Sequence, residues 1–186
     1  EYAPSSSIFF ERNGLPDYVK DFSSRERKKI SSDIKIIAVS KLKAWKNVDQ
    51  VFAEVSKIAK INESYNFILD IVGDGPEYKR LLDIKPSFER NNLCIQMIGA
   101  VGHKTVLNKM SKADLFISLY GVSNLGNPLL EALFLKMPII TKPEPEIKKI
   151  LGDNYNGFIE RIDDQDILNV LKSCSKDIEN LSPNIK

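Results

Sequence analysis

The residues best suited to chemistry lie where an apolar stretch meets a helix, between Ser118 and Ala132. A polar, glycine-containing loop leads into Asn127 and Pro128, which suit a helix start: asparagine as the N-cap, proline as the first helical residue. The free N–H groups of a helix start attract an anion, usually phosphate. Glu131 follows in the first turn, and helical side chains lean toward the N-terminus, so its carboxylate can reach back to the loop. A phosphate cradle beside a carboxylate suits a nucleotide, with the carboxylate for ribose hydroxyls.

Two lysines follow the first apolar strand, Lys41 and Lys46. Loop lysines are usually solvated, but at the carboxyl end of a strand they are placed to neutralise a diphosphate. Trp45 either shields that contact or packs on the surface.

A glycine pair, Gly73 and Gly75, superficially opens like a dinucleotide fingerprint. Tyr78 stands where the third glycine belongs, and Pro76 suits a helix start better than an inner turn, so we do not expect NAD binding. The two glycines either make a tight strand-to-helix turn or help to shape a nucleotide pocket.

The remaining titratable candidates are weak. His103, the only histidine, has no partnered Asp or Ser in the sequence, so we expect helix-start or surface packing rather than catalysis. The acidic run 163–166 precedes the last predicted helix and is expected to cap it rather than to bind metal. We expect no metal site and assign no catalytic residue.

The composition excludes several classes of protein. With 186 residues, 42% of them hydrophobic, the chain can bury one substantial core, and a net charge of +2 gives no strong field for nucleic acid. Cys94 and Cys174 lack pairing or metal spacing, so both are interpreted as reduced packing residues, which fits a cytoplasmic location. No apolar run is long enough to span a membrane. The chain lacks an initiator Met, and we expect it to be a piece of a longer protein.

Strand and helix patterns alternate along the chain. Strands are predicted at 34–39, 66–72, 93–99, 114–119, 138–141 and 157–160, and helices at about 48–59, 76–84, 106–110, 128–136, 144–151 and from 164. Apolar strands separated by helices indicate a doubly wound, Rossmann-like α/β fold, whose parallel sheet binds ligands at the carboxyl ends of its strands. Residues 34–186 are predicted to form this domain. The polar residues 1–33 are predicted to be a linker or the end of an upstream domain, with a short helix near 24–30.

Several short motifs share an order and spacing with one known family. They lie at 40–49, 72–77, 97–101, 126–132, 136–141 and 156–159. Together they resemble the C-terminal, donor-binding domain of GT-B glycosyltransferases of the family-4 type, the large retaining group. The resemblance covers roughly residues 34–175 and implies one half of a GT-B fold.

That resemblance implies a site for a nucleotide-sugar. Lys41 and Lys46 would hold the diphosphate, Glu131 the ribose, and the strand end at Gly99, Ala100 and Val101 the base. The phosphates and the transferred sugar would face the loop and helix start formed by Ser123, Asn124, Gly126, Asn127, Pro128 and Leu129. The donor would be a UDP-sugar or GDP-sugar, with no separate cofactor.

The chain departs from the family pattern at the sugar end. Ser123 replaces the first glutamate of the family's Glu-x7-Glu motif, although Asn124 or Asn127 could supply some of its hydrogen bonds. Lys41 replaces an arginine, and residues 142–146 replace a Gly-Gly loop. A non-catalytic nucleotide-binding or partner module is therefore the alternative to an active hexosyltransferase.

The resemblance also sets expectations for partners. A saccharide or lipid-linked acceptor, as in polysaccharide biosynthesis, would bind through an N-terminal domain that this chain lacks. The fragment alone is then expected to bind nucleotide without turnover. Nucleic acid is not expected as a partner, and peripheral membrane contact stays open.

Overall fold

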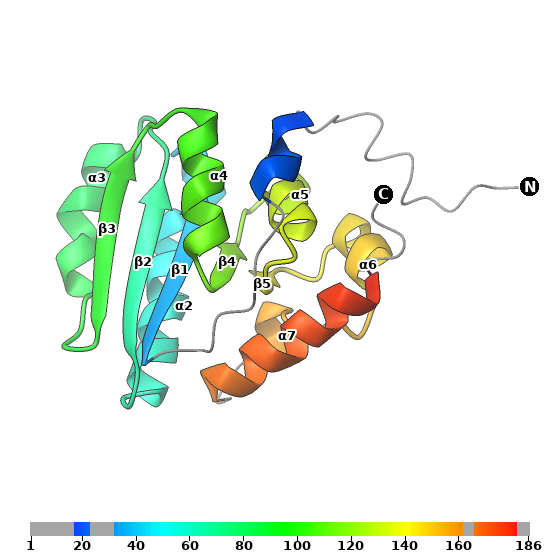
Figure 1. The fold of residues 1–186 in the computed structure, drawn as a ribbon. Coiled ribbons are helices and arrows are strands. Elements are labelled where there is room, and N and C mark those ends of the chain that lie inside the picture. The colour runs from blue at the N-terminus through cyan, green and yellow to red at the C-terminus, as the bar shows by residue number, and fades with distance from the viewer. Residues whose placement is uncertain (1–16, 23–31, 162–165, 182–186) are drawn as a thin grey trace, which may run out of the picture.

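A single parallel sheet organises the part of the chain that the computed structural model describes, residues 17–22, 32–161 and 166–181 (Figure 1). Its strands are β1 (Asp33–Val39), β2 (Asn66–Val72), β3 (Leu93–Gly99), β4 (Leu115–Ser118) and β5 (Ile139–Thr141). They are ordered β3-β2-β1-β4-β5, and every pair is parallel. Successive strands are added to one side of β1 up to β3 and to its other side from β4 onward. Doubly wound sheets bind ligands where the strand order reverses in this way. The predicted doubly wound α/β fold is confirmed.

Helices cover both faces of this sheet. The α-helices are α2 (Val48–Ile61), α3 (Tyr78–Ile84), α4 (His103–Lys112), α5 (Asn127–Phe134), α6 (Pro145–Leu151) and α7 (Ile167–Leu181). Shorter 3-10 turns are η1 (Asp17–Phe22), η2 (Ala44–Lys46), η3 (Lys85–Ser87) and η4 (Ile159–Arg161). In Figure 1, α2 and α3 lie behind the sheet and α4 lies in front. Because crossover connections are right-handed, the helices that connect strands on either side of this reversal must lie on opposite faces of the sheet.

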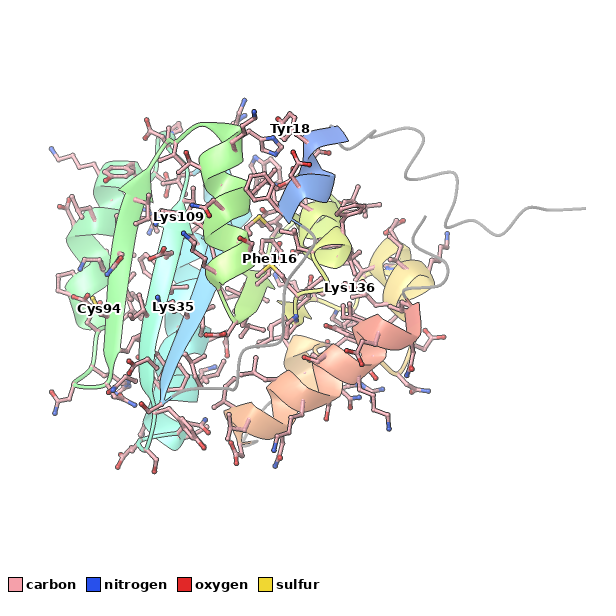
Figure 2. The ribbon with its side chains drawn as sticks, in the orientation of Figure 1. Tyr18, Lys35, Cys94, Lys109, Phe116 and Lys136 are labelled. Carbon is pink, nitrogen blue, oxygen red and sulfur yellow. The ribbon has the colours of Figure 1, made fainter. Side chains whose placement is uncertain are left out.

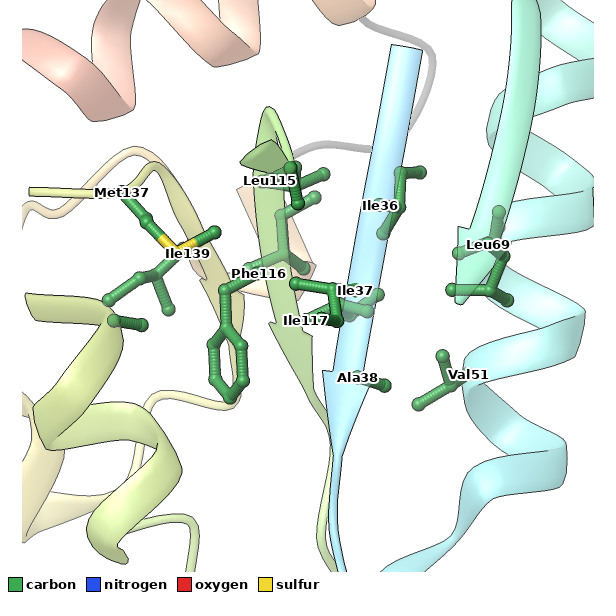
Figure 3. Close-up of a cluster of buried hydrophobic side chains, with 14 of the residues drawn as sticks. Ile36, Ile37, Ala38, Val51, Leu69, Leu115, Phe116, Ile117, Met137 and Ile139 are labelled. Atoms are coloured by element: carbon green, nitrogen blue, oxygen red, sulfur yellow. The ribbon is translucent and has the colours of Figure 1, made fainter. Parts of the chain in front are cut away.

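The central strand shows why its sequence is apolar throughout. Ile36, Ile37 and Ala38 of β1 are all buried, because β1 is covered on both faces (Figure 3). The edge strand β3 instead alternates, with Leu93 buried and its neighbour Cys94 exposed. The prediction that Cys94 is a packing residue is therefore wrong, and Figure 2 shows it on this outer strand. Cys174 is buried as expected, and both thiols are free.

The predicted strand at 157–160 does not form. Phe158 makes only an isolated bridge to Thr141, and the following residues turn as η4. Gly157 lies so close to β5 that a Cβ there would come within 2.0 Å of the Ile139 carbonyl oxygen. The chain thus lies alongside β5 for a single parallel bridge and then turns away, and the apolar side chain of Phe158 is buried without a strand.

The segment before the sheet packs on the helices. Val19 of η1 is 1% exposed and belongs to the hydrophobic core, and η1 lies beside α4 and α5 in Figure 1. The boundary predicted at residue 33 stays a prediction, but η1 covers part of the domain beyond it. The helix predicted near 24–30 lies outside the described residues. No helix within the described ranges is long and apolar enough to cross a membrane.

Candidate functional site

The loops at the carboxyl edge of the sheet are tied to one another by backbone hydrogen bonds. The donors and acceptors are Gly73 N–H to Gly99 O (2.9 Å), Ser40 N–H to Val72 O (3.0 Å), Leu42 N–H to Asp74 O (3.0 Å) and Gly121 N–H to Trp45 O (2.8 Å). The loops after β1, β2, β3 and β4 therefore form one frame. The predicted site residues all lie on this frame or at the start of α5.

The two glycines after β2 serve a close backbone approach. A Cβ on Gly73, whose φ is +137°, would lie 1.8 Å from the Ser40 carbonyl oxygen. A Cβ on Gly75 would lie 2.5 Å from the Leu42 carbonyl oxygen. The tight-turn interpretation is confirmed, and the turn also supports the loop that carries Lys41.

The two candidate phosphate lysines have different surroundings. Lys41 is exposed, whereas the Lys46 ammonium lies 4.0 Å from the ring centroid of Trp45 and 3.4 Å from that of Tyr120. Burial, followed by repulsion from Lys43, lowers the pKa of Lys46 from 10.5 to about 8. Trp45 is 42% exposed, so it both contacts Lys46 and forms part of the surface.

The helix after β4 begins one residue earlier than predicted. Gly126 is the N-cap in an extended conformation, and Asn127 and Pro128 are the first two helical residues. The assignment of Asn127 as the cap is therefore wrong, and no side chain caps this helix. Proline is tolerated at the second position for the same reason as at the first, because neither N–H has a partner within the helix. Asn127 is exposed and Leu129 is buried.

Asn124 is buried, and its hydrogen bonds connect the loop after β4 to Glu144. It is fully buried, and its Oδ1 accepts hydrogen bonds from Ser118 Oγ (2.9 Å) and from the Tyr120 N–H (2.8 Å). Its Nδ2 donates to Glu144 Oε1 (2.5 Å) and to the Tyr120 carbonyl (3.3 Å), and its backbone N–H donates to Glu144 Oε2 (2.8 Å). All of these hydrogen bonds lie within the protein, and a role of Asn124 toward the transferred sugar stays a prediction.

Glu144 was missed by the sequence analysis. It precedes α6, in the segment that replaces the family's Gly-Gly loop, and its carboxylate contacts the loop between β4 and α5. No cation pairs with it among the described residues. Ser123 itself is exposed. Thus position 123 carries no charge, but the carboxylate of Glu144 accepts hydrogen bonds from the adjacent residue, Asn124.

Glu131 is the fifth residue of α5, so the prediction that it lies in the first turn is wrong, and it is 4% exposed. Its Oε1 lies 2.9 Å from His103 Nε2, and His103 Nδ1 lies 2.6 Å from the hydroxyl oxygen of Tyr18. Burial raises the pKa of Glu131, and the hydrogen bond with His103 opposes that rise. His103 begins α4 as expected, but its partnership with Glu131, 28 positions away, was not predicted.

The same contact brings the strand end after β3 toward Glu131. Gly99 ends β3 at a φ of +76°, Ala100 is exposed and Val101 is half-buried, and His103 follows two residues later. The structure thus connects the predicted ribose carboxylate to the segment that follows the predicted base-contacting residues, through His103. It does not tie Lys41 to any of the other predicted residues.

The acidic run before the last helix was expected to act as a cap. Residues 163 and 164 lie outside the described residues, but Asp166 Oδ1 accepts a hydrogen bond from the Leu168 N–H (2.9 Å), as a cap does. Within the described part of the chain, no group of three His, Cys, Asp or Glu side chains could hold a metal ion.

Comparison with known proteins gives a family and a fold. The sequence matches the family model for glycosyl transferases group 1 over residues 19–180. A comparison with curated proteins found no match.

Solved structures of similar fold include the following three. A TarM variant from S. aureus, solved with UDP among its ligands, has 18% identity and a TM-score of 0.63, over 88% of this chain and 35% of that one. HepE from Anabaena, in complex with UDP and glucose, has 14% identity and a TM-score of 0.61, over 99% and 48%. The C-terminal domain of LpcC, a group 1 family protein from Francisella tularensis, has 15% identity and a TM-score of 0.60, over 82% and 84%. The chain covers only 35% and 30% of the first two structures that it matches.

Proposed function

Because this chain belongs to the group 1 glycosyl transferases, we propose that it is the donor-binding half of a GT-B enzyme that transfers a hexose from a nucleotide-sugar. One observation carries this proposal. The buried carboxylate of Glu131 projects from the second turn of the helix after β4 and contacts the segment that follows β3. Those two segments meet beside the reversal of the sheet, where doubly wound folds bind nucleotides.

The nucleoside binds between these two segments. Glu131 accepts hydrogen bonds from the ribose hydroxyls, and the backbone at Gly99, Ala100 and Val101 lines the base. A buried carboxylate is a strong acceptor, and a hydrogen bond to a charged group contributes about 1.5–3 kcal/mol. UDP is the first nucleotide to test, because TarM and HepE were each solved with UDP. GDP is the alternative.

The diphosphate binds between the β1 loop and the start of α5. Lys41 and Lys46 carry positive charge, and the first turn of α5 presents N–H groups without helical partners. Both would stabilise the negative charge that builds on the diphosphate as the sugar leaves. The nucleotide-sugar is the substrate, and we propose no separate cofactor.

The acceptor binds elsewhere. A saccharide or lipid-linked acceptor would approach through an N-terminal domain, since the chain spans about a third of the matched full-length proteins. We propose a retaining reaction on the family resemblance. The 186-residue chain would bind nucleotide without turnover, and transfer by the chain alone would refute this division of labour.

A second candidate function is a non-catalytic partner module. It is favoured by Ser123, which is exposed and uncharged where the family motif has a glutamate, and by Asn124, whose amide is fully engaged within the protein. If the full-length protein binds a nucleotide-sugar but neither hydrolyses nor transfers it, this second function should replace the first.

Calorimetric titration with UDP and with GDP tests the proposal. Saturable binding of one nucleotide, at one site per chain, is the expected result. No heat of binding from either nucleotide at millimolar concentration would count against a donor site in this chain.

A further inference from the structure

Three side chains from three separate elements form a line of hydrogen bonds at the nucleoside end. Tyr18 comes from η1, His103 from the start of α4, and Glu131 from α5. The Tyr18 hydroxyl lies 2.6 Å from His103 Nδ1, and His103 Nε2 lies 2.9 Å from Glu131 Oε1. The two rings also meet edge to face, with centroids 5.6 Å apart. Figure 2 shows Tyr18 at the end of the molecule where α4 begins.

The chemistry of the three groups orders the protons along this line. An ionised carboxylate only accepts, so Nε2 must donate to Glu131. A neutral imidazole then has Nδ1 as an acceptor, and the Tyr18 hydroxyl donates to it. If the ring is protonated, both nitrogens donate and the Tyr18 oxygen accepts. Each of the two hydrogen bonds therefore has one donor and one acceptor in either state of the ring.

This line leaves half of the carboxylate available. His103 holds Oε1 of Glu131, and Oε2 has no hydrogen-bond partner among the described residues. A glutamate side chain has three rotatable bonds. If they are fixed before a ligand binds, less conformational entropy is lost on binding. A carboxylate held at one oxygen is ready to accept a hydroxyl at the other.

We propose that His103 is a positioning residue that fixes Glu131 for the ribose hydroxyls, and that Tyr18 fixes His103, so that η1 forms part of the nucleotide site. This inference rests on the proposed function. It adds a role for a segment that precedes the sheet and for the chain's only histidine. It also predicts that the discrimination between ribose and deoxyribose depends on His103, not only on Glu131.

The test compares each nucleotide with its 2′-deoxy counterpart by calorimetry. The ratio of the two affinities isolates the ribose contact from the phosphate contacts. We expect the wild-type chain to prefer the ribonucleotide by about tenfold, the value of one hydrogen bond of about 1.4 kcal/mol. The H103L variant should lose most of this preference. The H103Q variant, whose amide can donate to Oε1, should keep most of it, and Y18F should fall between.

Lys41→Ala is the matched control. It should weaken both nucleotides by the same factor and leave their ratio unchanged. A preference that persists undiminished in H103L would overturn the inference while leaving the proposed function standing. Equal loss of the preference in H103L and H103Q would also overturn it, because a merely structural role for the ring would then suffice. A wild-type chain that shows no preference, or no binding, would overturn the ribose role of Glu131 and the inference with it.

Discussion

Glu131 and Glu144 are two carboxylates near the same helix, and they are held in opposite ways. Glu131 projects from α5 itself and contacts an imidazole at the start of α4, so two packed helices fix it. Glu144 reaches across from the loop before α6 and contacts the amide of Asn124, so one loop braces another. The proposed nucleoside end thus has a carboxylate fixed by two helices and an imidazole, and the proposed sugar end has a carboxylate that joins two loops through a neutral amide.

This difference separates what the chain shares with its family from what it does not. By the resemblance of its sequence motif, Glu131 would correspond to the family's second glutamate and keep its residue type. At the sugar end, Ser123 has lost the family's charge, and the only carboxylate that contacts this loop in the described part of the chain comes from Glu144. We therefore expect substitutions at the nucleoside end to change nucleotide affinity, and substitutions at the sugar end to change stability or sugar discrimination.

The largest expected effect is on folding, at Asn124. Substitution by alanine would leave the buried Tyr120 N–H without its acceptor and the Glu144 carboxylate without one donor. Each group left unsatisfied costs about 1–3 kcal/mol, so we expect a loss of about 2–4 kcal/mol in the free energy of unfolding. Urea denaturation measures it. The exposed Asn127→Ala variant is the control and should change stability by less than about 0.5 kcal/mol.

The next effect is on nucleotide affinity, at Glu131. Its replacement by alanine should weaken nucleotide binding by about 1–3 kcal/mol, the range for a hydrogen bond to a charged group. The exposed Glu146 serves as a matched glutamate, and Glu146→Ala should bind nucleotide like the wild type. Calorimetry on both variants makes the comparison. Unchanged affinity in the Glu131 variant would place the ribose elsewhere.

A smaller effect concerns pH, at Lys46. Its pKa is about 8 in the folded protein without ligand, and a bound diphosphate favours the charged form. Nucleotide affinity should therefore fall as pH rises above about 8, because the lysine must then take up a proton to bind, and a factor of about ten per pH unit is the limit. In Lys46→Arg the guanidinium stays charged, so the fall should disappear. An identical pH profile in both proteins would exclude Lys46 from the diphosphate site.

The same lowered pKa predicts a trend in stability. The folded state binds the Lys46 proton more weakly than the unfolded state, whose lysine has a pKa near 10.5. This group's contribution to the free energy of unfolding should therefore rise with pH between about 8 and 10.5. The Lys46→Met variant should lack that contribution, and thermal unfolding across this window measures the difference.

The smallest expected effect is at Glu144. The glutamine variant keeps an oxygen for one Asn124 donor but loses the charge, so stability should drop by about 1 kcal/mol or less. Nucleoside diphosphate affinity should stay unchanged, since Glu144 contacts only the loop at Asn124 in the described structure. An affinity loss as large as that of the Glu131 variant would break the division between the two ends.

The sequence was sufficient for most of the fold. Strands at 66–72 and 93–99 were predicted with the bounds that the structure has, because each is a short, mostly apolar segment rich in Ile, Leu and Val or Met and bounded by polar or glycine residues. The local sequence pattern did not predict burial correctly where burial depends on a residue's position in the folded domain. Cys94 is exposed because β3 lies at the edge of the sheet, and Phe158 is buried without a strand.

The site was less predictable than the fold. Gly73 and Gly75 marked the tight turn, whereas the role predicted for Glu131 from local helix-start chemistry stays a prediction. His103 and Glu144 escaped because their partners are 28 and 20 residues away, and only the folded chain brings them together. The burial of Asn124 was not predicted either, since it follows from packing and not from the neighbours of Asn124 in the sequence.

A crystal structure of this chain with UDP bound, or GDP if calorimetry selects it, tests the central claim most directly. The account predicts the ribose hydroxyls within hydrogen-bond distance of the Glu131 carboxylate, with His103 still on Oε1. It also predicts the diphosphate between Lys46 and the first turn of α5. A nucleotide bound away from the carboxyl edge of the sheet, or a ribose with no contact to Glu131, would contradict it.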